Sequence, residues 1–396
     1  MIDVIKLFDE SIEESVGCTE PTAIGLAVAA AFQAANGRLP TDYARKRLDL
    51  PPVKISEQIE KITVRASRGI FKNALQVGIP YKDKLKGPDN AAAVGAFCDP
   101  ARKLELFADL NEEKVREAAT LLKAGKVNVI PNYEWDEIRI EAEVSTKKSN
   151  ATAIIRKEHT NIAHIEVNGK PVFDKPETPE EIDKLAGLQR LSDFIDIIEK
   201  ELPRQVNGKS AAARIEKALK TNYQALLTAE RTFSESGRKS FGLAIKNSVR
   251  EGALSRDYVN LAREKVSLAV EGRMAGFNMK VMTCAGSGNQ GLVATLPLII
   301  IALAEFTGKY PEQESQPASA LELMQAKTPA DWQRLIRATG LVYLIANYMS
   351  LNSGRLSASC GCDTTAGIGA TAGIAYFLTP DSAENRIGII GQAIHN

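Results

Sequence analysis

Apolar residues recur with helical spacing at both ends of the chain. Residues 1–36 contain two such stretches, "VIKLFDESIEESV" and "PTAIGLAVAAAFQAANG", and the second begins with a proline and ends with a glycine. The break between them is "GCTE". From residue 176 to the end we find no convincing strand, and the pattern predicts long helices, several of them rich in Ala and Gly.

The middle of the chain has the pattern of strands. "EKITVRASRGIF", "KVNVIPN", "EIRIEAEVST", "ATAIIRKEH" and "IAHIEVNGKPVF" alternate apolar and polar residues, and "NGK" is typical of a hairpin turn. Helical stretches are predicted at 90–97 and 111–124. We therefore predict an α+β protein, in which a mainly helical domain (residues 1–53 and 176–396) carries an inserted small α+β domain (residues 54–175) with a mainly antiparallel sheet.

Composition excludes several functional classes. Lys plus Arg (50) almost cancels Asp plus Glu (49), so no overall field would attract nucleic acid or an anionic membrane. The first residues, "MIDVIKLFDESIEESVG", carry acids throughout, unlike a signal peptide. The longest apolar run, 291–306, is shorter than the roughly 20 residues of a membrane span and contains a proline, so we expect a buried helix. We expect a cytoplasmic protein whose partner is a small molecule or another protein.

Five cysteines, too few for a disulfide scaffold, are the first candidates for chemistry. Cys18 precedes a helix that starts with a proline, where free backbone amides stabilise a thiolate or an anion. The alternative is a buried cysteine in a helix connection. Cys360 and Cys362 are separated by one residue, which does not suit structural zinc. Either one of them binds a cluster, or the stretch is a seam of small residues with incidental thiols.

A glycine-rich stretch and a histidine are further candidates. "MTCAGSGNQG" (282–291) exposes backbone amides beside Ser287 and Asn289, which suits a carboxylate or phosphate, although it could be only a tight turn between helices. His159 and His164 lie five residues apart on a predicted strand, so they face opposite sides and do not form a chelating pair. His159 could act as an acid, base or substrate ligand, or it is an ordinary surface histidine.

Six motifs, taken together, resemble the L-cysteine desulfidase family, which is related to the α chain of the iron–sulfur L-serine dehydratases. They are "GCTEPTAIGLA", "IFKNALQVGIP", "GAFCDPARKLE", "EHTNI", "GSGNQG" and "GRLSASCGCDTTAGIGATAG", in that order. The resemblance implies a lyase with a [4Fe–4S] cluster that eliminates the β substituent of L-cysteine or a close analogue such as L-serine. The products would be pyruvate, ammonia and, from cysteine, sulfide. Three cysteines would hold the cluster, whose fourth iron would act as a Lewis acid.

The resemblance assigns Cys18 and Cys362 as cluster ligands, with Cys360 as the less favoured choice for the second. Members of the family continue into a segment with a Cys-Asp-Gly motif that this sequence lacks. Three expectations therefore stay open for the third ligand: Cys284 substitutes, a second chain supplies the thiolate, or no stable cluster forms. Cys98 matches no ligand of the family, and we interpret it as a core thiol.

The other roles follow from chemistry weighed against that resemblance. An amino-acid substrate needs a partner for its carboxylate and groups that orient it. For proton abstraction we expect His159 first and Lys72 second. Two rival hypotheses are a cluster-free amino-acid-binding or regulatory protein and the incomplete α chain of a two-chain enzyme; a homodimer and the choice between cysteine and serine stay open. The predicted substrate-binding residues are Asn73, Asn161, Arg273, Ser287, Gly288, Asn289 and Arg355, with Lys72 as a further partner for the carboxylate.

Overall fold

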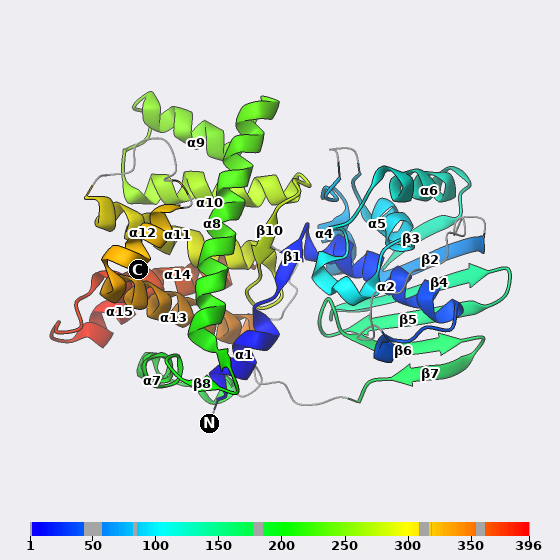
Figure 1. Cartoon of the computed structure of the whole chain (residues 1–396), viewed down its shortest axis with the longest axis horizontal. Helices are drawn as coiled ribbons and strands as arrows, with labels where there is room; N and C mark the ends of the chain where they lie inside the picture. The colour runs from blue at the N-terminus through cyan, green and yellow to red at the C-terminus, as the bar shows by residue number, and fades with distance from the viewer. Residues whose placement is uncertain are drawn as a thin grey trace. The chain divides into compact units, whose positions relative to one another are not determined.

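The structure is a computed structural model and confirms the α+β class. The chain divides into two compact units, which are treated in turn (Figure 1). The helical unit consists of Met1–Glu14, Pro179–Gly272 and Lys280–Asn396, and the sheet unit of Ser15–Thr178 and Arg273–Met279. The residues that the structure describes are 2–42, 58–81, 85–176, 185–308, 317, 319–353 and 361–395.

The sheet unit contains a six-stranded sheet in the order β3-β2-β4-β5-β6-β7. β2 and β3 pair in parallel and all other neighbours pair antiparallel, so the mainly antiparallel sheet is confirmed. Asn168 and Gly169 both have positive φ in the predicted hairpin turn. The strands are β2 (Ile59–Ser67), β3 (Val127–Asn132), β4 (Arg139–Thr146), β5 (Asn150–Arg156), β6 (Ile162–Val167) and β7 (Lys170–Asp174).

The first strand is shorter than its alternating pattern predicts. β2 ends at Ser67, and the next residues form α4 (Arg68–Ala74) instead of continuing the strand to Phe71. Ile70 and Ala74 are the buried residues of α4. Residues four apart share one face of a helix, so the helical conformation buries both of them on the same side.

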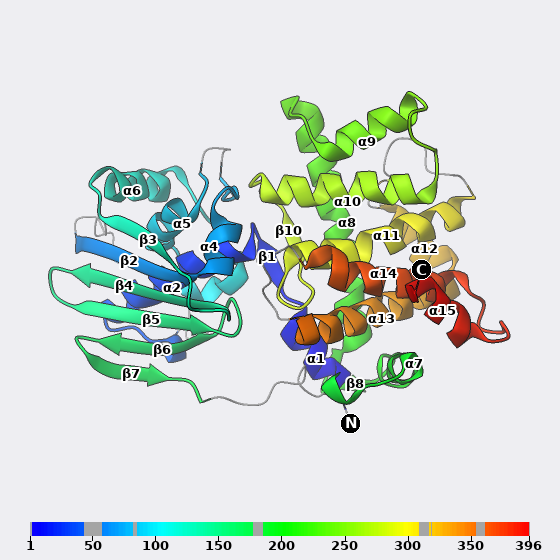
Figure 2. The ribbon, with the colours of Figure 1, turned by 180° about the vertical axis from the view of Figure 1, so that it is seen from behind.

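Helices cover one face of this sheet, and Figure 2 shows the sheet from its other side, in front of the helices. α2 lies against β4 and β5 and against α5. Its residues are apolar on nearly all sides and almost all buried, as expected of a helix enclosed by other elements. We expected α2 to belong to the helical domain, and the domain boundaries themselves stay a prediction. The helices are α2 (Thr19–Ala35), α4, α5 (Pro88–Gly95) and α6 (Glu112–Lys123), with short turns η1 (Pro40–Asp42) and η2 (Pro100–Glu105).

The crossing of α2 and α5 depends on two glycines. A Cβ atom added at Gly95 would lie 2.5 Å from the Gly25 Cα atom, far closer than side-chain contacts allow. We expect Gly95→Ala to lower the free energy of unfolding by about 1–3 kcal/mol, because the two backbones must separate. Urea denaturation would measure this change. Gly187→Ala, where the added carbon meets nothing within 4 Å, is the control, and equal effects of the two variants would contradict the prediction.

The helical unit is built from long helices with a few very short strands. Those short strands were not predicted: we expected none in the helical parts. They are β1 (Glu14–Val16), which crosses the boundary between the units, β8 (Gln205–Val206), β9 (Lys209–Ser210) and β10 (Lys280–Met282). The helices are α1 (Val4–Ser11), α7 (Leu191–Glu201), α8 (Ala211–Ser236), α9 (Phe241–Arg250), α10 (Tyr258–Met274), α11 (Gly288–Thr307), α12 (Ser319–Lys327), α13 (Pro329–Ser353), η4 (Cys362–Ala366), α14 (Gly367–Leu378) and α15 (Arg386–His395).

The apolar run forms the central helix α11, in contact with α8, α13 and α14. With 20 residues α11 is long enough to cross a membrane, contrary to our expectation from the run alone. However, 78% of its most apolar window is buried within the protein, which matches a core helix. Among the described residues, α11 is the one helix that is long and apolar enough for a span.

Small residues allow α13 and α14 to pack closely. A Cβ atom added at Gly373 would lie 2.4 Å from Val342 Cγ2, and one at Gly369 would lie 2.8 Å from the Val342 carbonyl oxygen. The seam of small residues is therefore real for this pair of helices. It accounts for Gly369 and Gly373, although not for Gly367, where an added Cβ atom meets nothing within 4 Å, nor for the cysteines before them.

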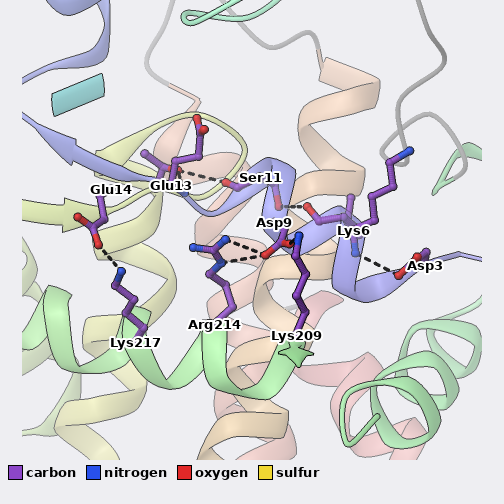
Figure 3. Close-up of polar contacts among 11 residues, drawn as sticks. Asp3, Lys6, Asp9, Ser11, Glu13, Glu14, Lys209, Arg214 and Lys217 are labelled. Carbon is purple, nitrogen blue, oxygen red and sulfur yellow. Dashed lines mark hydrogen bonds and ion pairs between the residues drawn. The ribbon is translucent and has the colours of Figure 1, made fainter. Parts of the chain in front are cut away.

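Ion pairs attach the first residues of the chain to the helical unit (Figure 3). Asp9 on α1 pairs with Arg214 (2.7 Å) on α8 and with Lys209 (2.6 Å) just before it. Glu14 pairs with Lys217 on α8 and with Lys280 (2.5 Å) at the start of β10. Partial burial acts to raise the pKa of Glu14, but the hydrogen bonds and charges of the two lysines outweigh it and lower the pKa to about 2.

Candidate functional site

A glycine places Cys18 at the start of α2 in the sheet unit. Gly17 has φ +79°, and a Cβ atom there would lie 2.6 Å from Pro80 Cγ, so no other residue fits this approach. Cys18 then takes an extended conformation at the N-cap position, with 5% of its surface exposed. Cys18 therefore lies at a helix N-terminus, as predicted, and it is also buried, as the alternative held; its role as a ligand stays a prediction.

The side chain of Glu20 gathers three donors around it. Glu20 Oε2 accepts a hydrogen bond from the Cys18 thiol (2.9 Å) and another from the Thr19 hydroxyl (3.1 Å). Glu20 Oε1 accepts a hydrogen bond from Asn73 Nδ2 (3.1 Å), which α4 provides. The sequence analysis missed Glu20. The available signal was an acidic residue in the first helical turn, directly after the cysteine, where a carboxylate is favoured by the helix dipole.

Nearby charges lower the pKa of this carboxylate, whereas burial raises the pKa of the thiol. Burial acts to raise the pKa of Glu20, but the positive charge of His159 when protonated, the hydrogen bond from Cys18 and the charge of Arg273 outweigh it and lower the pKa. Burial and the Glu20 carboxylate raise the pKa of Cys18, against the opposite effect of Arg273. The sheet unit therefore holds a cluster of a thiol, a carboxylate, an imidazole and a guanidinium, the Glu20 cluster, with Asn73 as its amide.

His159 is buried, but not on a strand. It lies in the turn that follows β5, where Lys157 has φ +67°, and only 7% of its surface is exposed. The predicted strand position is therefore wrong, and so is the alternative of a surface histidine. His164 lies on β6 with Nδ1 2.6 Å from Asp174 Oδ1, so the two histidines do not act as a pair.

Arg273 comes from the far end of α10 and is 1% exposed. The residues after it are fixed against the loop around Gly78, whose backbone N–H donates to the Met274 carbonyl oxygen (2.9 Å). A Cβ atom at Gly78 would lie 2.4 Å from the Ala275 carbonyl oxygen, so this approach also requires a glycine. The close packing of these two segments holds Arg273 in the sheet unit.

Two other predicted residues of this unit lie differently. Lys72 is exposed on α4, next to Asn73 in the chain. The amide of Asn161 holds its own turn together: Nδ2 donates to the Arg156 carbonyl oxygen (2.9 Å), and Oδ1 accepts from Lys175 Nζ (2.7 Å). Asn161 therefore stabilises the turn that carries His159. Substrate binding by Asn161 stays a prediction.

In the helical unit, the glycine-rich stretch forms a tight turn that leads from β10 into α11. Cys284 and Ser287 exchange two backbone hydrogen bonds (3.0 and 2.9 Å) around Ala285 and Gly286, both of which have positive φ. Ser287 caps α11 by accepting from the Gln290 N–H (3.4 Å). The stretch is therefore a tight turn, as the alternative held, although a short strand and not a helix precedes it. Gly288 and Asn289 are the first residues of α11, and both are buried.

Asn222 of α8 fixes both sides of this turn. Its Nδ2 donates to the carbonyl oxygens of Met282 (3.2 Å) and Gly291 (3.0 Å), and its Oδ1 accepts from the Met282 N–H (2.7 Å). A Cβ atom at Gly291 would lie 1.9 Å from the Met282 carbonyl oxygen, so β10 and α11 approach as closely as a glycine permits. Asn222 was also missed, and its only signal was a polar residue on the apolar side of α8.

The remaining thiols differ in their surroundings. Cys362 begins η4, is 8% exposed, and has its sulfur 3.9 Å from Ser287 Oγ. Cys284 is fully buried, and burial raises its pKa strongly. Cys98 donates to the Val94 carbonyl oxygen (3.3 Å), and burial raises its pKa to about 12, as expected for a core thiol. The predicted residues Arg355 and Cys360 lie outside the described residues.

An iron–sulfur cluster fits these residues in kind but not in number. Cys18 and Cys362 lie at the start of α2 and of η4 and supply thiols, which bind iron once they are deprotonated. Within the described ranges, however, no group of three or more His, Cys, Asp or Glu side chains could hold a metal ion. A complete set of three ligands would need a residue beyond these.

Comparison with known proteins identifies relatives over nearly the whole chain. The family model described as serine dehydratase alpha chain matches residues 101–389. A UPF0597 protein of Desulfatibacillum aliphaticivorans is 31% identical over 381 residues, which cover 93% of this chain and 75% of that protein. UPF0597 proteins of Desulfotalea psychrophila (31% over 378 residues) and Clostridium botulinum (29% over 380 residues) cover 93% and 95% of this chain, and 75% of each relative. No solved structure matches this chain.

Proposed function

Since this chain belongs to the family of serine dehydratase alpha chains, we propose that it is a lyase that removes the β substituent of L-cysteine or L-serine. The products are pyruvate and ammonia, together with sulfide when the substrate is cysteine. We propose further that Cys18, Cys362 and a third thiolate hold a [4Fe–4S] cluster, which when bound would supply a Lewis acid for the leaving group. We also propose that the protein is cytoplasmic; the burial of α11 supports a core helix and not a membrane span.

The observation that carries this proposal is the Glu20 cluster, because it contains both charges that an α-amino acid requires. The buried guanidinium of Arg273 is suited to the substrate carboxylate, and the ionised Glu20 is suited to the substrate ammonium group. Asn73 already donates to Glu20 and holds that carboxylate in place. In a buried site each of these pairings is stronger than it would be in water.

Proton removal is assigned to His159, with Lys72 as the second choice. A neutral imidazole takes the α proton, and the electron pair of the Cα–H bond forms the Cα–Cβ double bond as hydrosulfide or hydroxide leaves. The resulting aminoacrylate tautomerises and is hydrolysed to pyruvate and ammonia. His159 is favoured because it lies buried and close enough to affect the pKa of Glu20, whereas Lys72 is exposed.

The test is anaerobic reconstitution of the whole chain with iron and sulfide, followed by iron counting, visible absorption and pyruvate release from L-cysteine and L-serine. We expect about four irons in the native protein. Cys18→Ser and Cys362→Ser should lose the absorption and the activity together. Cys98→Ser is the matched control, because Cys98 is as buried as the others and its thiol donates to the Val94 carbonyl oxygen of the preceding helix α5.

The other outcomes identify the rival functions. A colourless native protein that binds cysteine without turnover would be a cluster-free amino-acid-binding protein. If iron binds only after a second polypeptide is added, the chain is the α part of a two-chain enzyme. Loss of iron in Cys284→Ser as well would identify the third ligand.

A further inference from the structure

The sheet unit has a pocket that does not include the Glu20 cluster. Its volume is about 340 Å³, and it lies among α2, η2 and the strands β6 and β7. Leu26, Pro100, Ile162 and Phe173 form its apolar wall. Pockets that bind small molecules begin at about 300 Å³ and are mostly apolar, with a few polar groups that fix the orientation of the ligand.

Two lysines supply the charged groups of this pocket. Lys103 and Lys175 both line it, and none of the described residues that line it is acidic. Lys175 Nζ donates one hydrogen bond, to Asn161 Oδ1 (2.7 Å), and an ammonium group can donate three. The pocket therefore combines an apolar wall with two positive charges, which suits a ligand that has an apolar body and a single anionic group.

Lys103 has an unusual backbone conformation. Its φ of 49° and ψ of −118° interrupt η2 and are values that glycine normally takes. Leu104 and Leu106 follow Lys103 in the chain and are both buried, with 2% and 0% of their surface exposed. Their packing holds the backbone of Lys103 in this conformation. Strained residues that their neighbours fix in place are concentrated at binding sites, because the strain fixes the position of a side chain.

From this geometry we propose that the pocket binds a small monocarboxylate with an apolar chain. The apolar chain packs against Leu26, Ile162 and Phe173, and the carboxylate pairs with Lys103 and Lys175. The volume suits a ligand of about ten non-hydrogen atoms. Binding itself does not rest on the lyase assignment, since no residue of the Glu20 cluster lines this pocket.

The pocket shares two segments with the Glu20 cluster. Thr160, which lines the pocket, follows His159 in the chain, and Leu26 lies on the same helix as Glu20. An occupant therefore contacts the turn that carries His159 and the helix that carries Glu20. A bound monocarboxylate therefore acts as an effector that stabilises both the His159 turn and the helix α2.

Isothermal titration calorimetry of the whole chain with octanoate tests the proposal, with octylammonium as the ligand of equal length and opposite charge. We expect one site for octanoate and at least about tenfold weaker binding of octylammonium. The double variant Lys103→Gln/Lys175→Gln should lose at least about tenfold in affinity. Lys123→Gln, an exposed lysine at the end of α6, should bind octanoate like the native protein.

A second variant tests the apolar wall. Ala101→Trp fills the pocket without changing either lysine, and it should abolish binding. Circular dichroism would verify that each variant is folded, and the lysine variants decide the matter if Ala101→Trp is not. The proposal is overturned if octylammonium binds as well as octanoate, if the lysine variants bind like the native protein, or if no octanoate binds at millimolar concentration.

Discussion

Replacing Glu20 with glutamine is expected to weaken the binding of L-serine and L-cysteine by about 100-fold, because the substrate ammonium group loses the charge that pairs with it. Removing one partner of a buried charge pair costs about 2–5 kcal/mol. Glutamine keeps the size of the side chain and can still accept from Asn73, so the lost charge dominates the effect. Calorimetric titration of the variant with L-serine would measure it.

The comparison ligand for this prediction is 3-hydroxypropanoate, which lacks the ammonium group of serine. Its binding should change much less in Glu20→Gln than the binding of serine does. Glu113→Gln, at the same place in the first turn of another helix but exposed, should leave both affinities unchanged. Equal losses for serine and 3-hydroxypropanoate would mean that Glu20 only supports Cys18 and does not bind substrate.

Lowering the pH from 6 to 3 is expected to destabilise the native protein partly through Glu14. Its folded pKa of about 2 lies below the ordinary value of 4.5. The contribution of Glu14 to stability is therefore fully present above the ordinary pKa and is lost as the pH falls toward 2. After allowance for solvent screening, this contribution is about 2 kcal/mol at neutral pH.

Urea denaturation of Glu14→Gln at pH 6 and pH 3 would test this account. The variant should be less stable than the native protein at pH 6 and should lose less stability on acidification, because glutamine does not titrate. Glu251→Gln is the control, since Glu251 is 68% exposed and lies 4.0 Å from Arg250. An unchanged pH dependence in Glu14→Gln would show that Lys217 and Lys280 do not hold its carboxylate as described.

Local patterns were sufficient to predict most of the elements. The alternation in β4 and β5 predicts their buried face, because Ile140 and Ala142 on one strand and Ala151 and Ala153 on the next are all buried. The apolar run predicts the buried core helix α11. The partner of α2 could not be predicted in this way. A helix that is apolar on nearly all sides gives no periodicity that would indicate which elements enclose it.

The candidate site was predicted less completely than the fold. Cys18, Asn73, His159 and Arg273 were chosen from the sequence, and the structure brings their charges and donors to Glu20. Glu20 itself was missed because its importance depends on partners that are distant in sequence. Asn73 lies 53 residues away in the sequence. It reaches Glu20 because α4 packs against α2 within the sheet unit. His159 was placed on a strand because the polar residues after Arg156 were taken as part of the strand before them, whereas a positive φ at Lys157 ends that strand.

Because the sheet unit is discontinuous in sequence, the ribosome translates its last segment well after the rest of it. Its two parts, Ser15–Thr178 and Arg273–Met279, are separated by roughly 95 residues of the helical unit. At about 5–20 residues per second, a ribosome needs roughly 5 to 20 seconds to translate that interval. During this time the nascent sheet can form, but the loop at Gly78 still lacks the segment that packs against it. Glu20 and His159 therefore acquire their guanidinium neighbour only after Arg273 has been translated, when the rest of the sheet unit has already had time to fold.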